Sequence, residues 1–286
     1  MAIVLDNITY TYGMGTPFEK TALRGVSLTI ENGEFLGVIG HTGSGKSTFV
    51  QHLNGLLHPT TGTVTVNGVD ISASTEEAKK MRHKVGMVFQ YPEHQLFEET
   101  IAQDIAFGPK NLGLSADDVD ERVRDAMKFV GLDYDTYAER SPFHLSGGQM
   151  RRVAIAGVVA MNPDFLVLDE PSAGLDPFGR EEIFEEIIRL HKEKGITVIL
   201  VSHNMEDISR MASRLVVLDK GRVVLDGEPM DIFNNHRDEL QAVGVDVPPV
   251  SVTMEYLREQ GLDVSNCVLS VDDAVQAILE GGSHVK

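Results

Sequence analysis

Cysteine and basic side chains are scarce in this 286-residue chain. The single cysteine, Cys267, cannot form an intramolecular disulfide, so the sequence fits a protein of the reducing cytosol. Lysine and arginine number 25 against 43 aspartates and glutamates, which gives a formal net charge of −18. This balance argues against a general nucleic-acid binder, which needs a basic stripe to neutralise phosphates. It also argues against direct adsorption to anionic lipid head groups.

Long apolar runs are also missing. The longest, residues 153–161, spans nine residues and includes a glycine, whereas a helix that crosses a bilayer needs about 20 residues. Residues 1–6 lack the basic region that begins a secretory signal peptide. We therefore expect a cytosolic protein without a membrane-spanning segment.

The length fits one or two domains, and the charge is unevenly spread along the chain. The net charges are 0, −7, −4 and −7 for residues 1–90, 91–145, 146–230 and 231–286. A Pro-Pro step at residues 248–249 precedes two short helical patterns, residues 253–260 and 271–279. We therefore predict a main domain over residues 1–240 and a small helical C-terminal extension over residues 241–286.

Apolar patterns typical of strands and helices alternate along the chain. Strands are predicted at residues 3–11, 26–30, 35–39, 63–66, 85–89, 165–168, 196–201 and 215–218. The pair Asn67-Gly68 is a strong hairpin-turn signal. Helices are predicted at residues 115–131, with Ser115 as N-cap and Gly131 as stop, and at residues 180–194. Strands that alternate with helices indicate an α/β fold with a largely parallel core.

A glycine-rich loop follows the strand predicted at residues 35–39. The pattern G-x-x-x-x-G-K-[ST] is fitted by Gly40, His41, Thr42, Gly43, Ser44, Gly45, Lys46 and Ser47, followed by Thr48. Its glycines let successive backbone N–H groups converge on a phosphate at the positive end of a helix. Lys46 can reach the β- and γ-phosphates, and the Ser47 hydroxyl can ligate Mg²⁺. A glycine-rich turn with a chance Gly-Lys-Ser is the alternative, which the strand–loop–helix context disfavours. The motif by itself predicts a P-loop nucleotide site.

Two carboxylates end the buried strand predicted at residues 165–168. Asp169 suits a role in the metal shell, and Glu170 suits orienting or deprotonating a water aimed at the γ-phosphate. An acidic loop after a core strand is the alternative, and it would be favoured if no P-loop were present.

A second anion-binding nest lies at the start of a helical run. The segment is Leu145, Ser146, Gly147, Gly148 and Gln149, and its Ser-Gly-Gly step at the helix start forms the nest. A single nucleotide does not need two such nests in one site. The segment resembles the signature of ABC-type ATPases. In that family the signature closes over the γ-phosphate of ATP bound to the P-loop of the opposite subunit.

The resemblance covers roughly residues 1–230. It implies an ABC ATP-binding domain with a RecA-like, mostly parallel core, an N-terminal antiparallel β subdomain and an α-helical signature subdomain at about residues 91–160. It implies ATP and Mg²⁺ as ligands, with Ser47, Gln90 and Asp169 around the metal, Asp169 either directly or through water. It also implies Tyr12, with Tyr10 as competitor, as the aromatic on adenine, Glu170 and His203 as catalytic residues, and Ser172 and Asp176 in a loop at the dimer interface.

Three segments resemble one group within this family. Residues 85–101, 104–113 and 140–157 resemble the ATP-binding subunits of energy-coupling factor (ECF) importers, and the Phe-Gly-Pro and Gln-Met-Arg-Arg details favour the second of two paralogous ATPases. This implies a peripheral protein at the cytoplasmic face of the cell membrane that powers uptake of vitamins or metal ions. Its partners would be a second ATP-binding subunit, a transmembrane coupling protein and a substrate-capturing membrane protein. The solute, the choice of homodimer or heterodimer, and the roles of residues 241–286 and Cys267 stay open.

Two other classes are weighed against this interpretation. ABC ATPases of DNA repair or translation carry coiled-coil insertions, zinc modules or tandem cassettes, whereas this chain has one cassette and one cysteine. Self-contained P-loop kinases and GTPases have no need of the segment at residues 145–149. Within the ECF interpretation, we expect a groove near Glu93, Glu98 and Glu99 to attract arginine-containing helices of the coupling protein.

Overall fold

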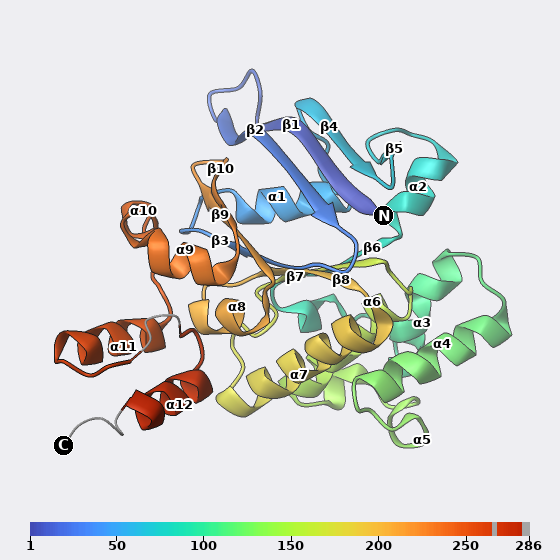
Figure 1. The fold of residues 1–286 in the computed structure, drawn as a ribbon. Helices are drawn as coiled ribbons and strands as arrows, with labels where there is room; N and C mark the ends of the chain where they lie inside the picture. The colour runs from blue at the N-terminus through green and yellow to red at the C-terminus, as the bar shows by residue number, and fades with distance from the viewer. Residues whose placement is uncertain (265–267, 282–286) are drawn as a thin grey trace.

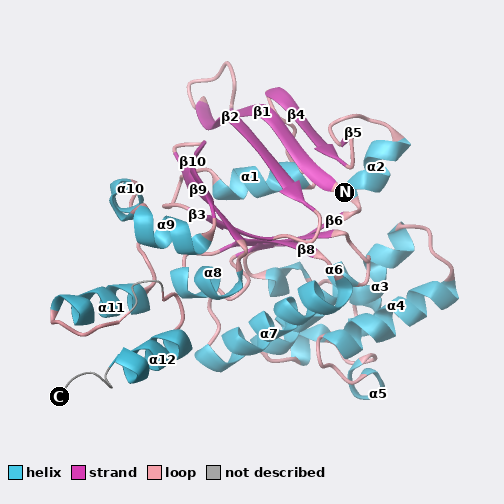
Figure 2. Cartoon of the chain, in the orientation of Figure 1, coloured by secondary structure: helices cyan, strands magenta, loops and turns pink. Residues whose placement is uncertain are grey.

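A computed structural model describes residues 1–264 and 268–281 (Figure 1). Cys267 lies outside the described residues. Within them the chain forms two sheets that lie one above the other, with most of the helices on the far side of the larger sheet (Figure 2). The two-sheet arrangement and the alternation of strands and helices confirm the predicted α/β class.

The smaller sheet is antiparallel. Its strands lie in the order β2 (Lys20–Glu31), β1 (Ala2–Tyr12), β4 (Thr61–Val66) and β5 (Val69–Asp70). The side chains of Ile3, Leu5 and Ile8 are buried, as expected for an antiparallel sheet that packs one face on the core and exposes the other to solvent. The predicted turn between β4 and β5 forms with Asn67 and Gly68 at φ +52° and +80°, the values that a two-residue hairpin needs.

The larger sheet carries the parallel core. Its strands lie in the order β10 (Arg222–Gly227), β9 (Arg214–Asp219), β3 (Phe35–Ile39), β8 (Thr197–Val201), β7 (Phe165–Asp169) and β6 (Val85–Val88). All neighbours are parallel except β10, which runs antiparallel to β9. Every residue of β3, β6, β7 and β8 is buried, because helices and the second sheet cover both faces. The loops after these strands therefore meet at one edge, where α/β proteins place their ligands.

Helices fill the space between the sheets and cover the larger one. The helix α1 (Lys46–Leu53) lies between the two sheets, as Figure 1 shows. The other α-helices are α2 (Glu76–Arg82), α3 (Ile101–Asn111), α4 (Ala116–Phe129), α5 (Tyr134–Tyr137), α6 (Gly147–Val159), α7 (Pro177–Lys194), α8 (Met205–Met211), α9 (Pro229–Asn235), α10 (Arg237–Ala242), α11 (Pro249–Glu259) and α12 (Val271–Gly281). Short 3₁₀ turns η1 (Pro92–Gln95) and η2 (Pro142–His144) precede α3 and α6. One apolar cluster packs between the sheets and another between the larger sheet and α3, α4, α6, α7 and α8.

The capping residues of α4 and α7 define their ends. Ser115 accepts from the backbone N–H of Asp118 and so caps α4, as predicted. Asp176 caps α7, and Gly195 ends that helix at φ +64°. These side chains and glycines satisfy backbone groups that a helix end otherwise leaves unpaired.

Some elements differ from the prediction. The helix α3 and the strand β10 were not predicted, and β6 ends at Val88, so Gln90 lies beyond the strand rather than at its end. In α3, Gly108 and Pro109 obscure the helical pattern, and Thr100 starts the helix by capping it. The predicted domain boundary between residues 240 and 241 stays a prediction.

The C-terminal helices α11 and α12 form near the predicted positions and enclose an apolar cluster of their own. Met254, Val264, Val268 and Ala274 form its buried part. Leu269 packs instead into the main core, where its carbonyl accepts from the Ser209 hydroxyl (3.1 Å). No helix in residues 1–264 and 268–281 combines the length and apolar character that a membrane crossing requires.

Candidate functional site

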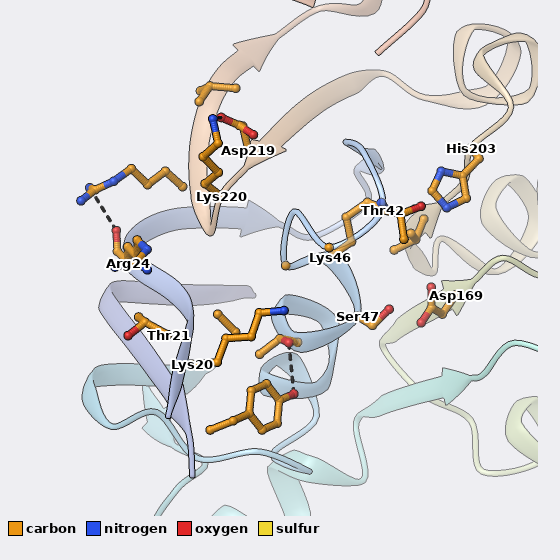
Figure 3. A pocket seen from close by; sticks show the side chains of 18 of the residues that line it. Lys20, Thr21, Arg24, Thr42, Lys46, Ser47, Asp169, His203, Asp219 and Lys220 are labelled. Atoms are coloured by element: carbon orange, nitrogen blue, oxygen red, sulfur yellow. Dashed lines mark hydrogen bonds and ion pairs between the residues drawn. The ribbon is translucent and has the colours of Figure 1, made fainter. Parts of the chain in front are cut away.

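A cleft of about 900 Å³ opens where the parallel strands end, below the antiparallel sheet. Predicted site residues from five separate segments line it: Tyr12, Thr42, Gly43, Gly45, Lys46, Ser47, Thr48, Gln90, Asp169, Glu170 and His203. Figure 3 shows Ser47 and Asp169 pointing toward each other, with His203 on the same side of the cleft. The fold thus joins residues that are up to 191 positions apart in the sequence.

The glycines of the P-loop are required by its backbone. Gly40 adopts φ +149°, and a Cβ there would lie 2.3 Å from the carbonyl oxygen of Leu218. Gly45 adopts φ +111° directly before α1. The buried Ser44 hydroxyl has no hydrogen-bond partner among the described residues. A glycine-rich loop with an unsatisfied buried hydroxyl at a helix start fits a phosphate ligand.

Lys46 is buried at the start of α1. Its ammonium donates to the carbonyl oxygens of Gly40 (2.6 Å) and His41 (3.1 Å). Burial lowers the pKa of Lys46, while the nearby Glu170 and Asp169 oppose that change. The lysine is therefore a partly desolvated cation between the loop and the two carboxylates.

Asp169 lies at the end of β7 and is nearly inaccessible to solvent. Burial raises the pKa of its carboxyl, although a hydrogen bond from Ser47 and the charge of Lys46 act in the other direction. Gln90 lines the same cleft. Hydroxyl, carboxylate and amide oxygens are the ligands that Mg²⁺ prefers, so the residues present fit this ion.

Glu170 follows Asp169 in a strained conformation with φ +52°. Its backbone N–H donates to the carbonyl of Val201 (3.0 Å), which fixes the residue against β8. Burial, and secondarily the charge of Asp169, raises the pKa of Glu170 to about 7. The Nε2 atom of His203 lies 3.3 Å from Oε1 of Glu170, yet Oε1 has no hydrogen-bond partner in the described structure. This oxygen is free to accept a proton near neutral pH.

The two tyrosines near the cleft have different surroundings. Tyr12 lines the cleft and its hydroxyl bonds to the Thr48 hydroxyl (3.1 Å). Tyr10 packs edge-to-face against Tyr12 and His52, with ring centroids 4.8 and 4.9 Å apart. Tyr12 therefore presents a ring to the cleft, and Tyr10 supports that ring.

The predicted signature lies elsewhere. Ser146 and Gln149 form a reciprocal capping box at the start of α6. None of the described cleft-lining residues comes from positions 145–149, and Ser146 and Gly147 are exposed. Ser172 and Asp176 are also absent from that lining. The structure does not bring these two segments together with the P-loop within one chain.

Arg151 is a residue that the sequence analysis missed. It is 2% exposed and forms a bidentate ion pair with Glu93, with nitrogen–oxygen distances of 3.0 and 3.1 Å. It also donates to the carbonyls of Pro171 and Ala173 (both 2.9 Å). The expectation that Glu93 offers its charge to a partner is therefore wrong, because Arg151 already neutralises it. The pair Arg151-Arg152 directly before an apolar helical run was the available signal.

A basic rim was also missed. Lys20, Arg24, Lys220 and Arg222 line the cleft from β2 and from the β9–β10 turn. In Figure 3, Lys20, Arg24 and Lys220 lie across the cleft from Asp169. The chain as a whole is strongly acidic, so these four side chains form a local region of positive charge.

Comparisons with known sequences agree with this geometry. A family profile described as "ABC transporter" matches residues 23–173. The energy-coupling factor transporter ATP-binding protein EcfA2 of Clostridium tetani is 53% identical over 280 residues, which cover 98% of this chain and 97% of that protein. The protein of the same name from Clostridium perfringens is 52% identical, with 98% of each chain covered.

Two solved structures are similar as well. The first is cbiO1 from Clostridium perfringens, described as part of the ABC transporter complex cbiONQ, with a TM-score of 0.73 and 36% identity over 84% of this chain and 94% of that one. The second is the ATP-binding cassette MJ0796 bound to ADP and Pi, with a TM-score of 0.70 and 32% identity over 79% of this chain and 98% of that one.

Proposed function

Since the chain belongs to the ABC transporter family, among the ATP-binding proteins of energy-coupling factor transporters, we propose that it powers uptake of a vitamin or a metal ion through partner membrane proteins. The fold is the P-loop ABC fold, and the protein is an ATPase that uses ATP with Mg²⁺. The observation that carries the residue assignments is the convergence of the P-loop, Gln90, the Asp169–Glu170 pair and His203 on one cleft.

The phosphates would be held by the P-loop. Its N–H groups and the dipole of α1 favour negative charge. The Lys46 ammonium, which donates to two backbone carbonyls in this structure, would donate to phosphate oxygens, which are stronger acceptors. Ser47, Gln90 and Asp169 would hold Mg²⁺, which polarises phosphoryl oxygens when bound. Tyr12 would stack on the adenine.

Glu170 would act as the general base. Its pKa of about 7 makes it a stronger base than an exposed glutamate, and its Oε1 accepts no hydrogen bond among the described residues. His203, in the loop after β8, would contact the terminal phosphate. Burial lowers the pKa of His203, so the ring is neutral at physiological pH and can donate one hydrogen bond without adding charge.

The signature at residues 145–149 would serve the nucleotide of a second ATP-binding subunit. This assignment is supported by its exposed position, its capping geometry and its distance from the cleft lining. The second subunit would be a paralogue, and residues 172–176 would contribute to the interface between the two. The relative cbiO1 is described as part of a complex, which supports an assembly of this kind. We place the complex at the cytoplasmic face of the cell membrane.

The substitution Glu170→Gln tests the catalytic assignment. It removes the base and keeps the side-chain shape, so ATP hydrolysis should fall by a factor of about 10²–10⁴ while ATP binding persists. Glu121→Gln on the exposed face of α4 is the matched control and should turn over at the parental rate. Parental turnover by Glu170→Gln would show that another group is the base.

The transport assignment needs a different experiment. A tagged chain would be purified from membranes in mild detergent, and the accompanying polypeptides and bound small molecule would be identified. We expect a paralogous ATPase and membrane proteins, one of which carries a vitamin or a metal ion. Recovery of the chain with soluble partners alone would contradict the proposal.

A further inference from the structure

The imidazole of His41 lies between two hydrogen-bond acceptors. Its Nδ1 is 2.7 Å from the carbonyl oxygen of Thr42, and its Nε2 is 2.9 Å from Oδ1 of Asp219. A carbonyl and an ionised carboxylate can only accept, and a neutral imidazole carries one N–H. Both contacts are satisfied together when the ring carries two protons. The ring therefore bridges the Thr42 carbonyl in the P-loop and the Asp219 carboxylate at the end of β9.

The Thr42–Gly43 peptide is the group that this ring controls. The N–H of Ser44 donates to the carbonyl of His41 (3.1 Å), which closes a β-turn, and Gly43 has φ +84°. These are the features of a type II turn, which differs from type I by rotation of its central peptide. Glycine at the third position makes that rotation easy, since it tolerates either sign of φ.

We propose that His41, held as an imidazolium by Asp219, is a positioning residue for nucleotide binding. In a trans peptide the C=O and the N–H point in opposite directions. By binding the Thr42 carbonyl, the ring fixes the direction of the Gly43 N–H. Gly43 lines the cleft, whereas His41 does not. The ring thus keeps one N–H donor directed at the phosphates without touching them.

Asp219 is itself held firmly. It ends β9, and its side chain is 16% exposed. The turn that follows is bonded to the loop, because the N–H of Gly221 donates to the Ser44 carbonyl (2.8 Å). On the other side of the loop, Gly40 packs against the carbonyl of Leu218. The carboxylate therefore lies at a fixed position relative to the P-loop.

Two cationic side chains contact Asp219 and the backbone of His41. Nζ of Lys220 lies 3.6 Å from Oδ2 of Asp219, and the Lys46 ammonium donates to the carbonyl of His41. Among the described contacts, Asp219 is the anionic partner of the ring, so Asp219→Asn tests the role of its charge.

The protonation state can be measured directly. Two-bond ¹H–¹⁵N correlation spectra of the full-length chain at pH 7.5 would be recorded, with the His41 signals assigned from a His41→Gln variant. We expect both ring nitrogens of His41 to carry protons, and Asp219→Asn to leave one of them with a lone pair. A ring with one N–H in the parental protein would overturn the proposal.

The effect on function is measured through binding. His41→Ala should raise the KM for ATP by about tenfold, the amount expected for one lost charge-assisted hydrogen bond, with kcat within about twofold and an unchanged Tm. Asp219→Asn should also raise the KM, and this variant provides the test if His41→Ala does not fold. His58→Gln, an exposed histidine outside the cleft lining, is the control and should match the parent. A parental KM in both site variants would overturn the proposal.

Discussion

Glu170 illustrates how a single residue can serve chemistry at the expense of stability. Its carboxyl is mostly withdrawn from water and lies beside Asp169, in a backbone conformation that non-glycine residues rarely adopt. Burial and the charge of Asp169 disfavour the ionised carboxyl in the folded protein, and the strained backbone disfavours the folded state whatever that charge is. Burial and the neighbouring charge also make the carboxylate a better base.

The stability cost should appear as a pH dependence. The folded pKa of about 7 exceeds the ordinary value of 4.5, so the folded protein binds more protons than the unfolded chain between these pH values. Stability from this group is therefore present below about pH 4.5 and is lost as pH rises through 7. Glu170→Gln should be more stable than the parent at pH 8, by about 3 kcal/mol at most, and equally stable near pH 4.5.

Urea unfolding of both proteins at several pH values measures this difference. Glu121→Gln controls for loss of one negative charge, and it should show no such pH-dependent gain. A Glu170→Gln advantage that does not shrink on acidification would show that desolvation of the carboxylate is not its cause.

Much of the site could be predicted at the residue scale, because its residues occur in short local patterns. Lys46, Ser47, Asp169 and Glu170 each follow a buried strand, and parallel strands end at one edge. The contacts of His41 with Asp219, 178 positions away, could not be predicted, since no local pattern encodes a pairing across the fold. Burial, which sets the pKa of Glu170, likewise exists only after folding.

At the scale of elements, Arg151 joins three segments. It connects α6 to η1 through Glu93 and to the loop after β7 through the carbonyls of Pro171 and Ala173. The signature helix, the segment after Gln90 and the predicted dimer loop are thus held by one side chain. A shift in any of the three must move or break these bonds.

Replacing Arg151 by methionine should be strongly destabilising. The change leaves the largely buried Glu93 without its partner, and breaking one side of a buried ion pair costs about 3–5 kcal/mol. Adding Glu93→Gln should recover part of that loss, and urea unfolding of the four proteins in the double-mutant cycle measures it. Arg124→Met removes an exposed ion pair on α4 and should leave the midpoint nearly unchanged. Equal midpoints for Arg151→Met and the parent would contradict the role of Arg151.

Strands could be predicted more completely than helices. The buried strands of the parallel sheet are near-continuous apolar runs, which the sequence shows directly. The helix α4 was equally clear, because it has one apolar face and a serine cap. By contrast, α3 carries a Gly-Pro step, and α8 and α9 are seven residues long, too short for a period to emerge.

At the scale of the whole molecule, the proposed signature at residues 145–149 predicts a protein that completes its chemistry in an assembly. A Cβ built on Gly147 meets no atom within 4 Å, so the single chain tolerates a side chain there. Gly147→Asp should therefore fold and bind ATP like the parent, yet lower the ATPase rate of the purified complex at least tenfold by placing a negative charge where we propose that the partner's phosphate binds. Binding is measured with a fluorescent ATP analogue on the chain alone. An unchanged rate in the complex would show that the signature does not act on a partner's nucleotide.

The basic rim of the cleft has a consequence for the speed of encounter with ATP. A total charge of −18 predicts repulsion of the nucleotide, so that added salt would accelerate association. Lys20, Arg24, Lys220 and Arg222 line the cleft, and we expect them to make the field at its entrance attractive, so that association slows with salt instead. Stopped-flow mixing at about 20–500 mM KCl measures how the association rate constant depends on salt. The double variant Lys20→Gln, Lys220→Gln should weaken that dependence, and Lys80→Gln, at an exposed position outside the cleft lining, should not. A nucleotide approaching this protein responds to the charges around the opening, and the sign of the salt effect on its arrival reports that local field rather than the charge of the whole.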